Sequence, residues 1–548
     1  MQILNQEIFF SPSDLITFLE SPFASHMERV KLLDPSVIDL MDPEDPVLKI
    51  LSQKGFEHED AFLERLKNEG KSIVVISNSS LDQMQSETIK AMHAGSDVIA
   101  QAYMKIDNFG GHADFLIKVP GESNLGSYFY EVWDTKLSRK MKPYFAVQLC
   151  CYNEMLEPLQ GLRCNNASIV LGSKDIVSLR LKDYFSYYLR LKETFLDFHS
   201  EWSNKTQPDP ALSLSFGRWS KYAEEILKKR RHLSLVANIT RTQVKRLEAN
   251  GINTIDDLSV SKLKTIPKLN KKIFTRLKSQ AELQVKSEGL DRPKLKILQN
   301  DESRKIGLAC LPPNSPFDVF FDIEGFPLLE GGLEYLWGST FFDKHGKRSF
   351  KDYWAHDQDE EEIALVNFID WVYSRWIENP SMHIYHYGSY EISAIRRLMG
   401  RYGQKEHEID TLLRNEVFVD LYNVVRHGLI VGEPSYSIKN IEHLYRGKRE
   451  TDIVGGGESV VAYEEWRAKP DGSNWQSSKT LNSIRDYNID DCNSTQELAS
   501  WLRIQQESNG IVYEDTRTEK EPQEIEALYH HGYSFYELKD FTSAKTLL

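Results

Sequence analysis

Residues 317–327 read FDVFFDIEGFP, and this stretch decides how the carboxyl-terminal half of the chain is interpreted. Apolar residues surround Asp322 and Glu324, and a strand with this alternation carries both carboxylates on one side. Gly325 next to them permits a close approach of the backbone. Two acids that project together from an apolar strand repel each other unless a cation lies between them. The alternative for this fragment alone is an exposed strand end whose charges are solvated.

The segments that follow this strand predict an α/β domain. Further strands are expected near residues 335–342 and 382–386, with amphipathic helices between and after them. Glu391 lies at a strand-to-helix transition in HIYHYGSYEISAIRRL. Tyr487 and Asp491 are four residues apart in RDYNIDD and therefore share one face of a predicted helix.

Four acids and a tyrosine in this order resemble the DEDD 3′–5′ exonucleases of the RNase H-like fold, in the version whose third motif is Y-x-x-x-D. The resemblance implies two Mg²⁺ or Mn²⁺ ions about 4 Å apart, bridged by Asp322. Glu324, Glu391 and Asp491 would complete the ligand set, and Tyr487 would orient the attacking water. The second motif of that family usually carries aspartate where this chain has Glu391.

A second set of strands is predicted nearer the amino terminus. Alternating apolar and β-branched residues predict strands over 97–108, 111–119 and 127–137, with a tight connection at Gly110 and Gly111. A helix is expected to follow, over about 143–159. These segments form the framework for a second group of charged residues.

This second group consists of two carboxylates and a lysine. Asp114 ends the sequence GGHAD, and Asp134 and Lys136 point to the same face of the next predicted strand. Two carboxylates that meet at a strand end can hold Mg²⁺ or Mn²⁺, and a neighbouring lysine can orient water or neutralise a phosphate. Ordinary surface alternation is the alternative for the D-x-K tripeptide taken alone.

With the helix that follows, this region resembles the RecB-like branch of the PD-(D/E)xK nucleases. The patterns G-x-x-D, D-x-K and Q-x-x-x-Y are matched at 111–114, at 134–136 and by Gln148 with Tyr152. The resemblance implies His58 as a further metal ligand on an upstream helix, although a lone helical histidine can equally be structural. Relatives with an iron–sulfur cluster carry one early and three late cysteines. Ser21 stands at the early position and the late trio is absent, so no cluster is expected.

The middle of the chain is basic and helical. Residues 221–300 hold 19 basic and 8 acidic side chains, a local net charge of +11 in a chain whose net charge is −14. A turn at Gly251 between two short predicted helices resembles a helix-hairpin-helix module, whose amides and helix ends contact phosphate. A solvated helical linker is the alternative. The nucleic-acid-binding residues implied here are Gly251, Lys262, Lys264, Lys268, Lys271 and Lys272.

Composition excludes several other classes of protein. No stretch of the 548 residues approaches the about 20 apolar residues of a membrane span, and a cytoplasmic location is expected. Five cysteines without a C-x-x-C pair exclude a disulfide framework and make structural zinc an unsuitable interpretation. No G-x-x-x-x-G-K-[ST] phosphate loop is present, so the sequence itself offers no site for ATP hydrolysis.

The whole sequence therefore predicts an α/β multidomain protein. The order of its parts resembles a family of bacterial and archaeal nucleases in which the same module is often joined to a superfamily 1 helicase. We expect a metal-dependent nuclease that acts on DNA, on single strands or ends, in DNA repair or defence against foreign DNA such as phage. The alternatives are an RNA-processing exonuclease and a nucleic-acid-binding scaffold with one or both centres inactive. The expected parts are a RecB-like PD-(D/E)xK domain with a restriction-endonuclease-like fold over 1–205, a helix-hairpin-helix-like linker over 206–300, an RNase H-like DEDD exonuclease domain over 301–506 and a polar tail over 507–548.

Overall fold

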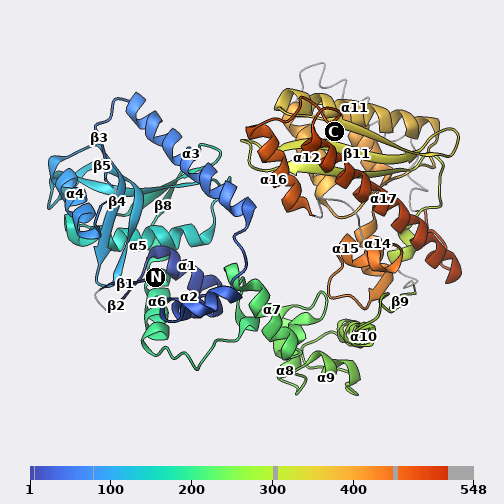
Figure 1. The fold of residues 1–548 in the computed structure, drawn as a ribbon, viewed down its shortest axis with the longest axis horizontal. Coiled ribbons are helices and arrows are strands. Elements are labelled where there is room, and N and C mark those ends of the chain that lie inside the picture. Colours follow the sequence, from blue (N-terminus) through green and yellow to red (C-terminus); the bar gives the residue numbers. More distant parts are fainter. Residues whose placement is uncertain (5–6, 78, 300–305, 448–454, 516–548) are drawn as a thin grey trace, which may run out of the picture. The chain divides into compact units, whose positions relative to one another are not determined.

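The computed structural model describes residues 1–4, 7–77, 79–299, 306–447 and 455–515. The chain forms two compact units (Figure 1). Unit 1 comprises Met1–Leu235 with Pro327–Gly332, and unit 2 comprises Val236–Phe326 with the chain from Leu333 onward. The division at Leu235 falls inside the range 206–300 that we expected to form one linker. Most of the expected tail, residues 516–548, lies outside the described residues.

Unit 1 is built around one sheet with helices before, within and after it. Its two amino-terminal strands and its helices are β1 (Gln2–Leu4), β2 (Glu7–Phe9), α1 (Pro12–Glu20), α2 (Pro22–Leu33), α3 (Pro46–Asn68), α4 (Leu81–Ala94), α5 (Pro143–Gln160), α6 (Lys182–Ser200) and α7 (Ser220–Lys229). Its sheet strands are β3 (Ile73–Val75), β4 (Val98–Ile106), β5 (Phe109–Ser123), β6 (Gly126–Lys136), β7 (Asn166–Leu171) and β8 (Ile176–Arg180).

The six-stranded sheet of unit 1 has the order β3-β4-β5-β6-β7-β8. Strands β4, β5 and β6 are antiparallel, as two short connections require, while β6 and β7 are parallel across the helix α5 that joins them. α5 packs against β4, β5 and β6, and its apolar residues form part of the main core with theirs. These elements confirm the strands and the helix predicted from periodicity.

The predicted connection at Gly110 and Gly111 is wrong. The chain turns at Asp107, whose φ is 50°, and both glycines lie inside β5. Their lack of a side chain serves packing instead, because a Cβ on Gly110 would lie 2.6 Å from the Tyr103 hydroxyl and one on Gly111 would lie 2.9 Å from Pro12 Cδ. The glycine pair looked like a turn because its packing neighbours are distant in sequence.

Unit 2 combines helices of very different lengths with a second central sheet. Its helices are α8 (Arg241–Glu248), α9 (Ile255–Val260), α10 (Lys271–Ser287), α11 (Gln358–Glu378), α12 (Tyr390–Tyr402), α13 (Glu406–Arg414), α14 (Leu421–Gly428), α15 (Ile438–Ile441), α16 (Gly456–Ala468) and α17 (Lys479–Ser508). Its strands are β9 (Leu295–Ile297), β10 (Val319–Phe326), β11 (Leu333–Phe342), β12 (Arg348–Trp354), β13 (Ile384–His386), β14 (Phe418–Asp420) and β15 (Leu429–Val431).

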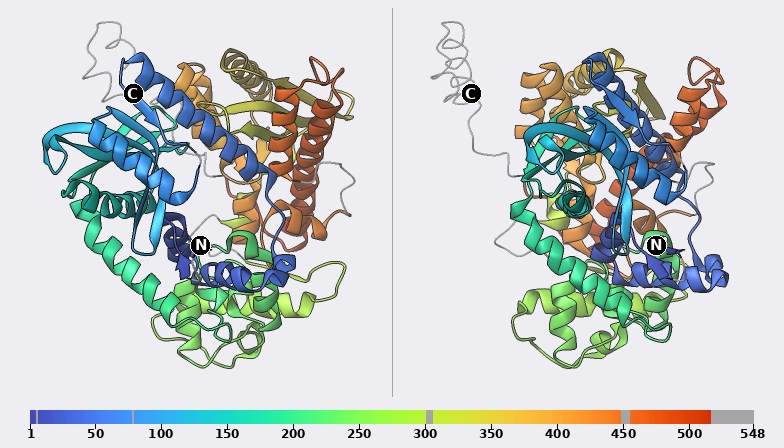
Figure 2. Two further views of the ribbon diagram at one scale, coloured as in Figure 1. Left: turned by 60° about the vertical axis from the view of Figure 1, so that its left-hand side comes forward. Right: turned by 90° about the vertical axis from the view of Figure 1, so that its left-hand side faces the viewer.

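The central sheet of unit 2 has the order β12-β11-β10-β13-β14. β10 is antiparallel to β11 and parallel to β13, so it lies in the middle of the sheet. The long helix α17 packs along β10 and β11, as the turned views show (Figure 2). This packing brings the first predicted acidic motif, on β10, next to the last one, on α17.

The basic helices α8 to α10 belong to unit 2 because α10 is anchored to the chain around β15. The Gln280 amide donates a hydrogen bond to the Val431 carbonyl oxygen at 2.7 Å, and β9 pairs with β15. The turn predicted at Gly251 between two short helices is confirmed, since it lies between α8 and α9, and Pro267 lies between α9 and α10.

Among the described residues, no helix is both long and apolar enough to cross a membrane.

Candidate functional site

Three carboxylates meet on one face of the unit 2 sheet. Asp322 and Glu324 project from β10, and Asp491 projects from α17. One ligand atom from each of these residues lies within 4.8 Å of the other two. The predicted common side for Asp322 and Glu324 is therefore confirmed, and Asp491 joins them because α17 packs on β10.

Burial makes the negative charge of this group costly. Glu324 is only 7% exposed, and burial together with the neighbouring Asp491 raises its pKa to about 7, against the lowering effect of its hydrogen bonds. The Ser459 hydroxyl, on α16, donates one of these bonds to Glu324 Oε2 at 2.6 Å. The Asn488 amide, on α17, donates to Asp322 Oδ2 at 2.8 Å. Closely spaced carboxylate oxygens that repel one another fit a hard divalent cation such as Mg²⁺ or Mn²⁺.

Tyr487 lies beside this group, as the Y-x-x-x-D spacing predicts. Its hydroxyl hydrogen-bonds the Asp491 carboxylate one helical turn away. Burial first, and then the charges of Asp491, Glu324 and Asp322, raise the pKa of Tyr487 far above its ordinary value. The hydroxyl therefore stays protonated at neutral pH and can orient a water molecule without removing its proton.

Glu391 is not a member of the three-carboxylate group. It lies in the first turn of α12 and is 4% exposed, and its Oε2 is 3.4 Å from His386 Nδ1 at the end of β13. Glu391 Oε2 and His386 Nδ1 are both buried without a hydrogen-bond partner. The predicted strand-to-helix position is confirmed, whereas the role of fourth ligand stays a prediction.

A further buried acid that sequence reasoning missed lies next to the site. Glu334, on β11, accepts a hydrogen bond from the Tyr390 hydroxyl at 2.8 Å and pairs with Arg397. Gly325 of β10 must lack a side chain here, because its Cβ would lie 2.0 Å from the Tyr390 hydroxyl and 2.6 Å from Glu334 Oε2. In the sequence, the signal for this close packing is Gly325, the glycine that follows Glu324.

Unit 1 brings the second predicted group together. Asp134 is 2% exposed and forms an ion pair with Lys136, and Asp114 Oδ2 accepts hydrogen bonds from the backbone and hydroxyl of Thr135 at 2.7 and 2.8 Å. Burial and the adjacent Asp114 raise the pKa of Asp134 well above its ordinary value. Burial alone would lower the pKa of Lys136, but Asp134 and Asp114 raise it on balance, so the ammonium stays charged.

The helix α3 adds Glu59, which sequence reasoning did not select, to this group. Burial first, and then the charge of Asp114, raise the pKa of Glu59 to about 7. Glu59 shares a helix face with Phe62 and Leu66, the two buried residues of α3. That i, i+3, i+7 stripe is the signal that could have identified it. The neighbouring His58 has its Nε2 3.2 Å from the Val170 carbonyl oxygen, and its predicted role as a metal ligand stays a prediction.

Gln148 and Tyr152 lie on α5, as predicted, and hydrogen-bond each other. Burial and then the charge of Asp134 raise the pKa of Tyr152. A Cβ on Gly111 would lie 3.2 Å from the Tyr152 ring, so G-x-x-D and Q-x-x-x-Y are in contact. Ser21, at the position of the early cysteine in iron–sulfur relatives, caps α2 by accepting from Ala24 N at 2.9 Å.

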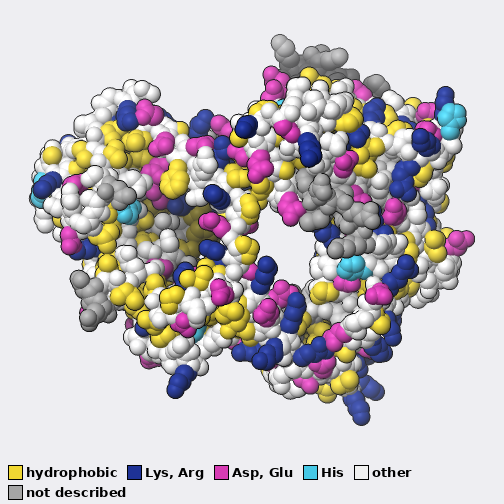
Figure 3. All heavy atoms as spheres, in the orientation of Figure 1, with side chains coloured by type: hydrophobic (Ala, Val, Ile, Leu, Met, Phe, Trp, Pro, Cys, Tyr) yellow, Lys and Arg dark blue, Asp and Glu magenta, His cyan; other side chains and the backbone are white. Residues whose placement is uncertain are grey.

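The predicted nucleic-acid-binding residues form an exposed basic surface on unit 2. Figure 3 shows Lys and Arg side chains gathered over α8, α9 and α10. Gly251 has a φ of 77° in the turn between α8 and α9, and Lys268 has a φ of 60° in the loop before α10. The exposed residues of this surface include all six predicted positions, Gly251, Lys262, Lys264, Lys268, Lys271 and Lys272.

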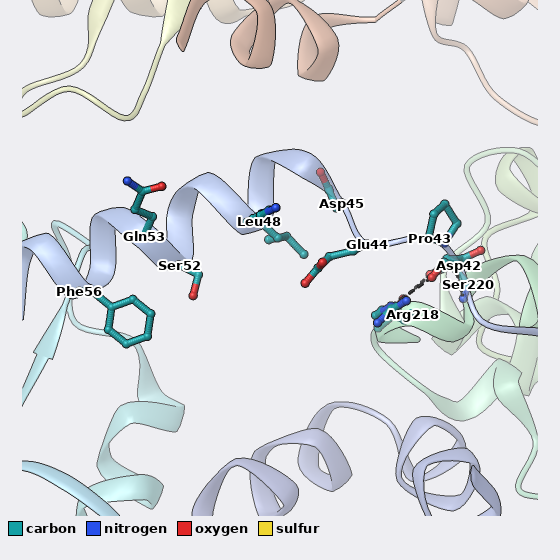
Figure 4. Close-up of a pocket in the computed structure, with 12 residues that line it drawn as sticks. Asp42, Pro43, Glu44, Asp45, Leu48, Ser52, Gln53, Phe56, Arg218 and Ser220 are labelled. Atoms are coloured by element: carbon teal, nitrogen blue, oxygen red, sulfur yellow. Dashed lines mark hydrogen bonds between the residues drawn. The ribbon is translucent and has the colours of Figure 1, made fainter. Parts of the chain in front are cut away.

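A pocket of about 660 Å³ lies elsewhere in unit 1, between the first half of α3 and a turn of 3-10 helix before α7 (Figure 4). Phe56, 65% exposed, points into it, and Arg218 Nε donates to the Asp42 carbonyl oxygen at 3.0 Å on its opposite side. Its lining includes the acids Asp42, Glu44 and Asp45. The bases Lys49 and Arg218 also line it, and the pocket holds none of the predicted site residues.

The comparisons with known proteins bear on unit 2. A search of curated protein sequences gave no match. Residues 319–503 match the family model of the RNase H superfamily, a range that contains β10, α17 and all three clustered carboxylates. Unit 2 thus contains an RNase H-like domain, which suggests a nuclease-type function for the chain.

Proposed function

We propose that this protein is a nuclease that hydrolyses DNA phosphodiester bonds with Mg²⁺ or Mn²⁺. The observation that carries the proposal is the group of Asp322, Glu324 and Asp491, with ligand atoms within 4.8 Å of one another in an RNase H-like domain. A bound cation would activate water for in-line attack and neutralise charge on the phosphate. The order of the motifs supports a 3′–5′ exonuclease of the DEDD type.

The side chains around this centre have separable tasks. Ser459 and Asn488 hold the carboxylates of Glu324 and Asp322 through the hydrogen bonds described above. Tyr487, kept protonated by its raised pKa, places the attacking water through its hydroxyl. Glu391 is the proposed fourth carboxylate. Its unpartnered Oε2 supports that role, because a buried carboxylate oxygen without a donor is open to a cation or a water.

A second centre in unit 1 is proposed from the buried Asp134 and the half-buried Asp114 with Lys136. Glu59 supports it, because this third carboxylate lies close enough to Asp114 for their charges to interact. His58 can serve as a ligand through Nδ1, since its Nε2 is placed to donate to the Val170 carbonyl oxygen. Histidine ligands of metals commonly donate their other ring nitrogen to a backbone carbonyl in this way.

The exposed lysines on α8 to α10 are proposed to bind the phosphate backbone without reading sequence. Charge reversal of Lys268, Lys271 and Lys272 together should weaken DNA binding and flatten its dependence on salt, because fewer counterions are released. An unchanged salt slope would instead assign these helices to a solvated linker. We also propose that the protein acts in the cytoplasm with a superfamily 1 helicase as its partner. Its role there would be in DNA repair or phage defence.

The central test is cleavage of single- and double-stranded DNA and RNA with Mn²⁺. The wild type is compared with Asp134→Ala, Asp322→Ala and the double variant. We expect the double variant to be inactive, and the single variants identify which centre cleaves which substrate. Activity that persists in the double variant would contradict both proposed centres. Cleavage of RNA alone would favour the RNA-processing exonuclease, and inactivity of the wild type on every substrate would favour the binding scaffold.

A further inference from the structure

Asn488 is a buried amide in the middle of the unit 2 site. It lies on α17, one residue after Tyr487, and its exposed fraction is 0%. Its Nδ2 donates to Asp322 Oδ2 at 2.8 Å, and its side chain also lies close enough to Glu324 to lower the pKa of that carboxylate. One side chain from α17 therefore contacts both carboxylates that β10 contributes to the site.

The opposite end of the same amide has no partner. Asn488 Oδ1 is buried without a hydrogen bond. An unpaired buried carbonyl is destabilising, so such a group persists where the rest of the side chain makes an interaction that outweighs this cost. The orientation found here directs the amide hydrogens to the two carboxylates and leaves the carbonyl oxygen unsatisfied. The opposite orientation would place a carbonyl oxygen against Asp322.

The sheet is shaped to admit this side chain. Gly338 of β11 lies directly opposite Asp322 in the ladder. A Cβ on Gly338 would lie 1.6 Å from Asn488 Oδ1. Asn488 therefore occupies the space that a side chain on the neighbouring strand would fill, in contact with the backbone beside Asp322.

We infer that Asn488 is a positioning residue that sets the orientation of Asp322 and Glu324 for metal binding. The carboxylate of Asp322 accepts a hydrogen bond from the amide through Oδ2, which fixes the plane of the carboxylate beside Glu324. The amide also offsets part of the repulsion between the two acids before a cation arrives. This inference rests on the proposed metal-dependent function of the same site and adds a residue that the motifs do not contain.

The chain offers a matched control on the same helix. Asn493 is five residues further along α17, and its Oδ1 accepts from the Thr340 hydroxyl of β11 at 2.9 Å. Asn493→Ala thus removes a hydrogen bond between α17 and the sheet without touching the clustered carboxylates. If Asn488 only joined helix and sheet, the two substitutions would have equivalent consequences for metal binding.

The test measures Mn²⁺ binding to the full chain by the electron paramagnetic resonance signal of free Mn²⁺. Asp114→Ala and Asp134→Ala are present throughout, so that the proposed centre in unit 1 does not contribute. We expect Asn488→Ala to raise the Kd for Mn²⁺ about tenfold or more, as substitutions behind metal ligands do, while Asn493→Ala leaves it unchanged. Asn488→Ser, which loses less packing, should shift the Kd in the same direction and serves if the alanine variant does not fold.

Three outcomes separate this inference from the proposed function. Equal Kd values for the Asn488 and Asn493 variants would overturn the positioning role. Mn²⁺ binding that Asp322→Ala leaves unchanged would overturn the location of the site and the inference with it. A tenfold weaker Kd in Asn488→Ala, in a protein whose wild type cleaves no nucleic acid, would support the positioning role while contradicting the nuclease proposal.

Discussion

Replacing Glu324 by glutamine should stabilise the metal-free protein at alkaline pH while weakening metal binding. Burial and Asp491 raise the pKa of Glu324 from 4.5 to about 7. The folded state therefore favours the protonated form. The stability that protonated Glu324 contributes to the folded state is present below pH 4.5 and is lost as the pH rises through about 7. Glutamine keeps the shape and the acceptor oxygen for Ser459 but carries no charge.

The size of the effect follows from that pKa. One pKa unit corresponds to about 1.4 kcal/mol, so a pKa raised from 4.5 to about 7 gives an upper bound of about 3 kcal/mol at pH 8. Because Glu324 and Asp491 interact, their titrations are coupled, and we expect Glu324→Gln to raise the free energy of unfolding by an amount on the order of 1–3 kcal/mol. Each kcal/mol moves the midpoint of thermal unfolding by about 2–4 °C in a unit of this size.

Differential scanning calorimetry in EDTA at pH 8 and pH 5 measures the effect. Glu324→Gln should unfold at a higher temperature than the wild type at pH 8, and the difference should shrink at pH 5. Added Mn²⁺ should stabilise the wild type by about 2.7 kcal/mol at a hundred times its Kd, and the variant by less. Glu378→Gln, which removes an exposed carboxylate of α11, is the control. A variant no more stable than the wild type at pH 8 would refute the argument that buried charge repulsion prepares the site for a cation.

Three further changes test other parts of the structure. Gly338→Ala should displace the Asn488 side chain and lower the affinity for Mn²⁺. It should also lower the free energy of unfolding by about 1–3 kcal/mol. An unchanged Kd for Mn²⁺ in a folded variant would contradict this. Lys268→Gly should raise the free energy of unfolding by up to about 1 kcal/mol, because Lys268 has a φ of 60°, which glycine adopts without strain. A lower free energy of unfolding in urea would argue against backbone strain at this residue. Burial lowers the pKa of His26 to about 4 and of His199 to about 3, so unit 1 should lose stability as the pH falls from 6.5 toward 4, where protonation favours unfolding. Replacing both histidines by glutamine should flatten that dependence between pH 6.5 and 5, and a profile identical to that of the wild type would count against it.

Much of the site follows from local periodicity. The repeat of two residues along a strand places Asp322 with Glu324 and Asp134 with Lys136, and the structure confirms both placements. The helical repeat likewise places Tyr487 one turn before Asp491, and their hydrogen bond follows from that spacing. These relations depend only on backbone geometry, so the sequence predicts them without knowledge of packing.

Local periodicity could not choose between neighbours on a helix. His58 and Glu59 are adjacent in sequence, yet only Glu59 lies on the stripe that Phe62 and Leu66 bury, and its carboxylate interacts with Asp114. In the same way, the pair Gly110 and Gly111 resembled a turn, whereas close packing inside β5 explains it. Both observations depend on residues of other elements, which contribute the neighbouring surface.

The sequence by itself determined which carboxylates could share a face, where the helices break and where basic charge is concentrated. Only the tertiary structure decided which of these faces meet. Asn488 and Asp322 are 166 residues apart and come together because α17 packs along β10, while Glu391 is turned toward His386 at the end of β13. A strand or helix fixes the direction of its side chains through its own backbone. Contact between elements depends instead on which apolar surfaces bury each other, and that is a property of the whole fold.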